Sequence, residues 1–166
     1  VGSLEPRKNL PLLIRALEAM DRPVPVLIAG WVGWGDKEWI RAIRTNEMAN
    51  RIYITGYIDD ETLACLYSGA QALVYPSLYE GFGLPLLEAM ACGCPVICSD
   101  AASLPEVAGD AAYQFKTGDQ EALADALERI PNDSEFRAQL IQKGFKRARD
   151  FDWKTSARQT LDVFRK

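Results

Sequence analysis

Residues 71–99 decide the fold, and they read QALVYPSLYEGFGLPLLEAMACGCPVICS. The run over 71–75 is short and apolar, which predicts a buried strand. A loop with two glycines follows over 76–83. A helix is expected over 84–92, because Pro85 is tolerated in a first helical turn. The apolar run over 95–99 predicts a second buried strand, so a strand, a helix and a strand follow one another.

The same alternation continues on both sides of this stretch. Further strands are expected at 26–30, 51–56 and 112–115, and helices at 9–20, 37–50, 59–67 and 104–108. The remaining chain is expected to be helical over 119–130, 133–150 and 152–165, with Pro131 separating the first two helices. This order predicts an α/β fold: a Rossmann-like parallel sheet with helices on both faces and a helical C-terminus.

Polar side chains at the helix starts support these boundaries. The residues able to cap a helix are Asn9, Asp59 or Asp60, Asp133 or Ser134, and Asp152. In a parallel sheet of this kind, ligands bind beyond the carboxyl ends of the strands. The candidate functional loops are therefore 3–9, 30–36, 56–60, 76–84 and 99–104.

The composition excludes several classes of protein. The 166 residues are 48% hydrophobic, and 19 basic against 23 acidic residues give a net charge of −4. This balance argues against disorder and offers no basic excess for a nucleic-acid partner. The chain has no histidine, which excludes Ser-His-Asp triads, Cys-His dyads and His-ligated zinc within it. One domain is expected over 1–166, and Val1 at the start suggests a fragment of a longer protein.

The cysteines allow two interpretations. Cys92, Cys94 and Cys98 form C-x-C-x3-C, but a zinc site has paired C-x2-C spacing or histidine support. Small thiols suit a helix end, a tight turn and a buried strand, so packing is favoured and no metal site is predicted. Free thiols also fit a reducing compartment, which indicates a cytoplasmic protein.

The loop over 76–83 and the helix after it carry the chemistry. Gly81 and Gly83 let the backbone approach a ligand closely, and the amides of Gly83 and Leu84 lie near a helix N-terminus that favours anions. Glu88 stands one turn into the helix, and its carboxylate can accept from two hydroxyls of a vicinal diol such as a ribose. Glu80 can accept from a sugar hydroxyl. The simpler alternative is a glycine-rich loop with two solvated glutamates.

A basic pair follows residues 1–3, which look like the end of a strand. Arg7 and Lys8 could bind a diphosphate, the arginine as a fork and the lysine as a point charge. The alternative is a solvated basic pair. Because cations are disfavoured at a helix N-terminus, their position favours an anionic ligand.

Taken together, these motifs resemble a known family. Glu80-x7-Glu88 within EGFGLPLLEAMACGCPVI resembles the signature of retaining GT-B glycosyltransferases, closest to family 4 or "glycosyltransferase group 1". The opening VGSLEPRKNL, residues 1–10, resembles the start of that family's C-terminal, donor-binding domain. Residues 54–58, 99–100 and 104–107 also fall where the family has related segments, so the resemblance spans nearly the whole chain.

The resemblance implies a role for each matching residue. Glu88 would hold the ribose hydroxyls, and Glu80 would contact the transferred sugar. Arg7 and Lys8 would stabilise the leaving diphosphate. The other expected donor-binding positions are the backbone of Gly81, Phe82, Gly83 and Leu84 at the sugar and phosphate, and Tyr57, Ile58 and the loop after Gly30 at the base. Ser3 departs from the family, where many members carry Arg; either Arg7 substitutes for that Arg or the phosphate clamp is weaker.

The resemblance also implies the reaction and its partners. We expect metal-independent, retaining transfer of a hexose to a glycan or a lipid-linked acceptor, with no cofactor. The donor is a nucleotide sugar, GDP-mannose being favoured and a UDP-sugar next. The acceptor-binding N-terminal domain is absent from this chain, and the last helix would cross back toward it. Membrane contact, at the inner face, would arise only through the full-length enzyme.

Three other readings compete with transfer. A nucleotide-sugar-binding module without transfer activity fits the same residues. A glycoside hydrolase could use Glu80 and Glu88 as acid and nucleophile, but the glycine loop would then have no role. A sugar-nucleotide epimerase has a similar two-domain build, but its motif differs.

Overall fold

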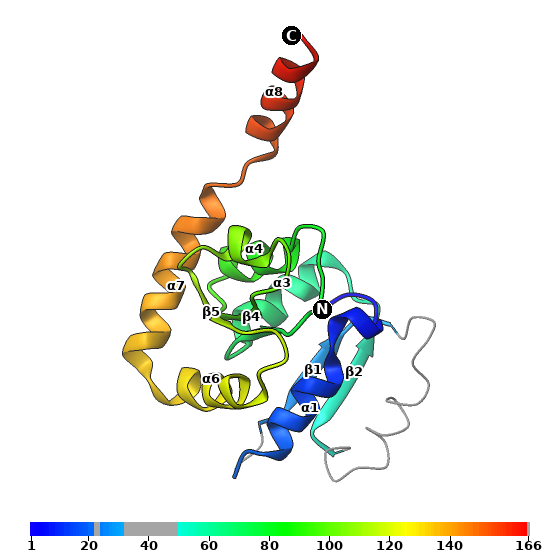
Figure 1. Ribbon diagram of the computed structural model, residues 1–166, viewed down its shortest axis with the longest axis vertical. Coiled ribbons are helices and arrows are strands. Elements are labelled where there is room, and N and C mark those ends of the chain that lie inside the picture. The colour runs from blue at the N-terminus through cyan, green and yellow to red at the C-terminus, as the bar shows by residue number, and fades with distance from the viewer. Residues whose placement is uncertain (22–23, 32–49, 166) are drawn as a thin grey trace.

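Parallel strands and helices alternate along the chain, as the sequence predicts. A computed structural model describes residues 1–21, 24–31 and 50–165 (Figure 1). The helix expected over 37–50 and the loop expected over 31–36 fall almost entirely outside the described residues. The α/β class, with parallel strands flanked by helices and a helical C-terminus, is confirmed.

The strands within the described residues form two parallel sheets, whereas the sequence predicts one. β1 (Val26–Ala29) pairs with β2 (Ile52–Gly56), and β3 (Leu73–Tyr75), β4 (Val96–Ser99) and β5 (Ala112–Phe115) form the second sheet in that order. The segment 2–4 runs beside β1, because the amides of Gly2 and Leu4 donate to the carbonyls of Ala29 and Trp31 at 2.9 and 3.0 Å. A cavity of about 680 Å³ is lined by residues of this segment and of both sheets.

The helices begin and end close to the expected residues. They are a 3₁₀ turn η1 (Pro6–Lys8), α1 (Leu10–Glu18), α3 (Asp60–Gly69), α4 (Leu84–Ala91), α5 (Leu104–Ala108), α6 (Gln120–Asn132), α7 (Ser134–Arg149) and α8 (Trp153–Phe164). The caps by Asp59, Asp133 and Asp152 are confirmed, since each carboxylate accepts from a backbone amide at 2.7–3.0 Å.

Two local expectations are wrong. Asn9 precedes α1, but its side chain makes no capping bond, because Asn9 ends η1 in a left-handed conformation with φ of 51°. Pro131 does not end α6 at residue 130. It lies in the last turn, and the helix runs on to Asn132. η1 itself was not expected, and it places Arg7 and Lys8 in a tight turn.

Two apolar clusters hold the helices against the strands. In the first, Leu12 and Leu17 of α1 and Leu123 and Ile130 of α6 pack with Ile97 of β4. In the second, α4 packs on β4 and α5. The residues of this cluster include Leu86, Ala89 and Met90 of α4, Val96 and Cys98 of β4, and Leu104 and Val107 of α5. α7 approaches α4 closely, since a Cβ at Gly144 would lie 3.2 Å from the Met90 side chain. The last turn of α4 is therefore held against α7.

The cysteines behave mainly as packing residues. Cys94 and Cys98 are buried in the second cluster, and burial raises the pKa of their thiols to about 11 and about 12. Cys92 is half-buried and Cys65 is exposed. Within the described part of the chain, no group of three or more His, Cys, Asp or Glu side chains is placed to hold a metal ion.

The last helix stands apart from the rest. Figure 1 shows α8 extending away from the body along the long axis, and all of its residues are exposed. Its apolar side chains Trp153, Leu161, Val163 and Phe164 are thus largely open to solvent. Of the helices in the described ranges, none combines the length and the apolar character that a membrane span requires.

Candidate functional site

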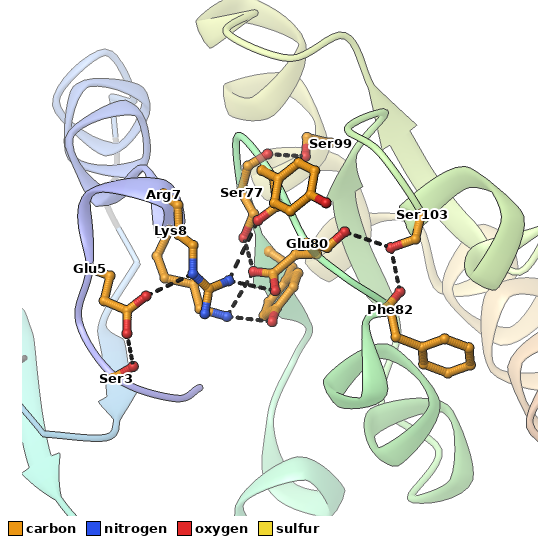
Figure 2. A network of polar contacts seen from close by, with 11 residues as sticks. Ser3, Glu5, Arg7, Lys8, Ser77, Glu80, Phe82, Ser99 and Ser103 are labelled. Carbon is orange, nitrogen blue, oxygen red and sulfur yellow. Dashed lines mark hydrogen bonds and ion pairs between the residues drawn. The ribbon is translucent and has the colours of Figure 1, made fainter.

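Two loops meet at the carboxyl ends of the strands and bring the predicted charged residues together. The first follows the segment 2–4 and contains η1, and the second follows β3 and runs to α4. The Leu78 amide donates to the Arg7 carbonyl at 2.7 Å and ties the loops to each other. Figure 2 shows the result: Arg7 and Lys8 from the first loop face Glu80 from the second.

Glu80 is the centre of this arrangement. Its Oε2 accepts from Arg7 Nη1 at 2.7 Å, and its Oε1 accepts from Lys8 Nζ and Ser77 Oγ, each at 2.8 Å. Its side chain is only 8% exposed. A buried carboxylate is stable only when it is paired and hydrogen-bonded, and here both oxygens are satisfied.

The charges in this cluster shift one another's pKa. Burial raises the pKa of Glu80, but the hydrogen bonds from Lys8 and Ser77 and the nearby cations outweigh it, so the pKa lies below the usual value. The pKa of Lys8 lies below its usual value, because burial and the nearby Arg7 together lower it by more than Glu80 and Glu5 raise it. Burial also lowers the pKa of Arg7, but Glu5 and Glu80 outweigh that effect and raise it. Glu80 is therefore ionised at neutral pH.

Three serines fix the loop that carries Glu80. Ser77 is fully buried and donates to the Glu80 carboxylate, and Ser99 Oγ donates to the Ser77 carbonyl at 2.6 Å. Ser103 Oγ lies 3.0 Å from the Glu80 carbonyl and 2.8 Å from the Phe82 carbonyl. These serines, and the link from Glu5 to Arg7, were not foreseen from the sequence. The available signal was their position just after the apolar runs, in the candidate loops.

The glycine loop ends in a helix start that is open to a ligand. Gly83 is the residue before α4, with φ of 113°, and a Cβ there would lie 2.9 Å from Leu104, so glycine is required. The Leu84 amide is at the first helical position and has no intrahelical acceptor. A Cβ at Gly81 would meet nothing within 4 Å, so packing does not explain a glycine there. The Phe82 ring packs edge-on against Phe151, with centroids 5.9 Å apart.

Two buried tyrosines are bound to Glu88 and to Lys8 of the charged cluster. Glu88 is exposed, and its Oε2 accepts from the Tyr67 hydroxyl at 3.1 Å. Lys8 Nζ donates to the Tyr75 hydroxyl at 2.5 Å. Burial raises the pKa of Tyr75, and Glu80 and, more weakly, Glu88 raise it further. Both glutamates of the Glu-x7-Glu motif therefore raise the pKa of the buried Tyr75.

A second group of predicted residues lines a smaller cavity of about 280 Å³. Gly30, Tyr57, Ile58 and Ser3 are among its lining residues, together with Trp31, the first residue of the predicted loop after Gly30. Gly30 must be glycine, because a Cβ there would lie 1.8 Å from the Gly2 carbonyl oxygen. Tyr57 is 82% exposed and Trp31 is also exposed, so two aromatic rings are available beside this cavity.

The larger cavity touches the charged cluster through Lys8. Its lining is mostly apolar, with Lys8, Tyr67 and Tyr75 among the polar residues that reach it. It includes the start of the glycine loop, Pro76 and Ser77, but neither Glu80 nor the two glycines. The predicted residues thus form three neighbouring groups: the cluster of Arg7, Lys8 and Glu80; the start of α4 with Gly81, Phe82, Gly83, Leu84 and Glu88; and the smaller cavity with Ser3, Gly30, Tyr57 and Ile58.

The fold and this site define a Rossmann-like α/β domain with a charged cluster at the carboxyl ends of its strands. The family "Glycosyl transferases group 1" matches residues 1–147, and the chain belongs to that family. Its fold matches solved GT-B glycosyltransferase structures.

Individual relatives cover the whole chain. It is 36% identical to O-antigen chain mannosyltransferase B of Escherichia coli over an alignment of 169 positions. The alignment covers 99% of this chain and 44% of the relative. It is 34% identical to phosphatidyl-myo-inositol mannosyltransferase of Mycobacterium leprae, covering 96% of this chain and 43% of the relative. The chain therefore spans less than half the length of these curated relatives.

Solved structures agree on the fold. Sucrose-phosphate synthase from Thermosynechococcus elongatus superposes with a TM-score of 0.85 at 29% identity, over 99% of this chain and 44% of that one. HepE of Anabaena in complex with UDP-glucose superposes with a TM-score of 0.86 at 23% identity, over 98% of this chain and 47% of that one. The second likeness concerns the fold alone.

Proposed function

We propose that this chain is the donor-binding domain, over residues 1–166, of a retaining, family 4 hexosyltransferase. The single observation that carries this proposal is the cluster of Arg7, Lys8 and Glu80 at the carboxyl ends of the strands, beside the N-terminus of α4. Two cations and a helix start suit a diphosphate, and a carboxylate among them suits a sugar.

The diphosphate of the donor lies between Arg7, Lys8 and the amides of Gly83 and Leu84 in this proposal. In the structure, the Glu80 carboxylate pairs with both cations, at 2.7 and 2.8 Å. Donor binding therefore exchanges one anion for another: the diphosphate takes over the cations, and the Glu80 carboxylate is released toward the sugar hydroxyls. The backbone of Gly81, Phe82 and Gly83 completes the sugar contacts.

The nucleoside extends away from this point. Glu88 accepts from the two ribose hydroxyls, and the Tyr67 hydroxyl, 3.1 Å from its Oε2, holds the carboxylate in place. The base enters the smaller cavity beside Gly30, Tyr57 and Ile58. Trp31 and Tyr57 offer it exposed aromatic surface.

The chemistry follows from charge. When the anomeric bond breaks, negative charge grows on the diphosphate oxygen that leaves. Cations and amides aimed at that oxygen stabilise the charge without a metal ion, and electrostatic stabilisation of this kind usually contributes more to catalysis than any other effect. Attack from the same face within an ion pair retains the anomeric configuration and needs little from a base, which is consistent with a chain that has no histidine.

GDP-mannose is the favoured donor, and a UDP-sugar is the next. Support for mannose comes from the relatives, two of which are named mannosyltransferases at 36% and 34% identity. Support for the UDP-sugar is weaker, since HepE, which was solved with UDP-glucose, shares the fold at 23% identity. The relatives are named as transferases, and this favours transfer over epimerisation. The acceptor would be a glycan or a lipid-linked glycan.

The rest of the active site would come from an N-terminal acceptor-binding domain. The chain covers 44% of the E. coli relative, which leaves room for such a domain in a whole enzyme. The exposed apolar side chains of α8, among them Trp153 and Phe164, are suited to pack against it. Alone, the chain would be a nucleotide-sugar-binding module without transfer activity. Its buried thiols suit the reducing cytoplasm, where membrane contact would be peripheral and made through the full-length enzyme.

Calorimetric titration tests the proposal. GDP-mannose, UDP-glucose, GDP and UDP are titrated separately into the chain in buffer with EDTA. Saturable binding of one nucleotide over the other without metal is expected, and it names the donor base. If none of the four binds, donor binding by this chain is refuted, and the same titration on a longer protein containing it shows whether a second domain is required.

A further inference from the structure

Arg7 is held by a carboxylate, that of Glu5, to which the family resemblance assigned no role. Glu5 Oε2 accepts from Arg7 Nε at 2.7 Å, and Glu5 Oε1 accepts from Ser3 Oγ at 2.6 Å. Figure 2 shows the resulting chain of contacts, which runs from Ser3 through Glu5 and Arg7 to Glu80. The contacts of Glu5 with Ser3 and Arg7 lie within the first loop, and the contact of Arg7 with Glu80 crosses to the second loop.

Arg7 and Lys8 differ in how much support they need. Lys8 is 11% exposed and packs over the Tyr75 ring, with Nζ 4.4 Å from the ring centroid, so its position is set by its surroundings. Arg7 is 40% exposed. A long side chain at such a position samples many rotamers, and ordering it on ligand binding has an entropic cost. The guanidinium of Arg7 therefore needs a fixed partner if it is to meet a phosphate in one orientation.

The contacts of Arg7 divide the guanidinium by function. Nε donates to Glu5, and Nη1 donates to Glu80 and, at 3.5 Å, to the Tyr79 carbonyl. Nη2 makes no hydrogen bond to any residue in the described ranges. If a diphosphate replaces Glu80, both terminal nitrogens become available to it while the bond between Nε and Glu5 persists. Glu5 can therefore hold the arginine before, during and after the exchange of anions.

We propose that Glu5, oriented by Ser3, is a positioning residue that fixes Arg7 for the donor diphosphate. This rests on the proposed function, since it assumes that Arg7 meets a phosphate. In this proposal Ser3, which was predicted to be a donor-binding residue, acts on the donor indirectly, by orienting Glu5. An opposing effect has to be weighed, because the Glu5 carboxylate also repels a phosphate. At an exposed arginine that repulsion is screened by solvent and salt, whereas the orientation is kept, so orientation dominates.

The test compares GMP with GDP, which differ by one phosphate. The ratio of their dissociation constants isolates the part of binding that Arg7 serves, and a general loss of structure would weaken both nucleotides alike. The variants are Glu5→Ala, Glu5→Gln and Ser3→Ala, with Glu128→Ala, an exposed glutamate on α6, as the control. Glu5→Gln keeps an acceptor for Arg7 and a donor for Ser3 but removes the charge.

We expect Glu5→Ala to lower the preference for GDP over GMP by roughly threefold to tenfold, as for one ordered charge-assisted bond. Ser3→Ala should lower it less, and Glu128→Ala should leave it unchanged. Glu5→Gln should keep it or raise it. In ¹H–¹⁵N spectra, the Nε–Hε signal of Arg7 should be sharp and slow to exchange in the wild type and in Glu5→Gln, but not in Glu5→Ala.

Other outcomes overturn the proposal. If Glu5→Ala raises the preference for GDP as Glu5→Gln does, Glu5 only competes with the phosphate. If all variants keep the wild-type ratio, Glu5 has no part in binding. If the wild type itself does not distinguish GDP from GMP, the proposed function fails at the diphosphate. The Arg7 signal then still shows whether Glu5 orients the guanidinium.

Discussion

Glu80→Gln is the change that most sharply tests the ion-pair cluster. The amide keeps the shape of the side chain but removes the charge that faces Lys8 Nζ at 2.8 Å and Arg7 Nη1 at 2.7 Å. Removing one partner of a buried ion pair costs about 3–5 kcal/mol. The pair with the 40% exposed Arg7 contributes at most about 1 kcal/mol because solvent screens it. The amide oxygen still accepts one hydrogen bond, so we expect a net loss of about 2–3 kcal/mol.

The assay is thermal unfolding with and without GDP. For a chain of this size the loss corresponds to a fall in Tm of roughly 5–10 °C. GDP supplies the missing negative charge, and a ligand that binds the folded state raises its stability. GDP should therefore raise the Tm of the variant by more than that of the wild type, and it should bind the variant roughly threefold to tenfold more tightly, since no carboxylate has to be displaced.

The matched control is Glu128→Gln, which changes an exposed carboxylate of α6. It should leave both the Tm and the GDP affinity unchanged. GDP-mannose should gain less than GDP in the Glu80 variant, because the sugar loses its acceptor. A Glu80 variant with the wild-type Tm, or with weaker GDP binding than the wild type, would refute the idea that Glu80 occupies the place of the diphosphate.

Three further predictions concern the parts around this cluster. Glu88→Gln should weaken GDP binding about tenfold by calorimetry, because a charged acceptor for two hydroxyls is lost; unchanged affinity would remove Glu88 from the ribose site. Because the pKa of Glu80 is lowered on folding, its contribution to stability is complete above the usual carboxyl pKa and is lost as the pH falls through its lowered value. The wild-type Tm should therefore fall below about pH 4, and Glu80→Gln should show less of that fall; equal falls in both proteins would contradict this. Gly30→Ala should lower the Tm strongly, since a Cβ would lie 1.8 Å from the Gly2 carbonyl oxygen, and a Tm equal to that of a Gly69→Ala control, whose Cβ meets nothing within 4 Å, would contradict the close approach.

Local signals in the sequence predicted the elements well. Apolar runs mark β1, β3 and β4, and the carboxylates of Asp59 and Asp133 mark helix starts, because a strand or a cap depends on residues that lie next to one another. The helix cap predicted at Asn9 is wrong, because the conformation of Asn9 is set by η1, and the sequence carries no clear signal for that turn.

Contacts between distant residues could be predicted only in outline. The topology placed Arg7, Lys8 and Glu80 in loops at one edge, but it gave no reason to pair them, since each was expected to meet a ligand. Glu80 lies more than 70 positions after Arg7 and Lys8 in the chain, and only the folded arrangement shows that its carboxylate pairs with both cations. The supporting serines, among them Ser77, escaped notice for the same reason, because a small polar residue has a role only through what lies opposite.

A crystal structure of the chain with GDP-mannose tests the central claim most directly. The account predicts that the nitrogens of Arg7 and Lys8 lie within hydrogen-bond distance of the diphosphate, with Glu88 on the ribose hydroxyls and Glu80 turned toward the mannose. A donor bound elsewhere, with Glu80 still paired to Arg7 and Lys8, would contradict it.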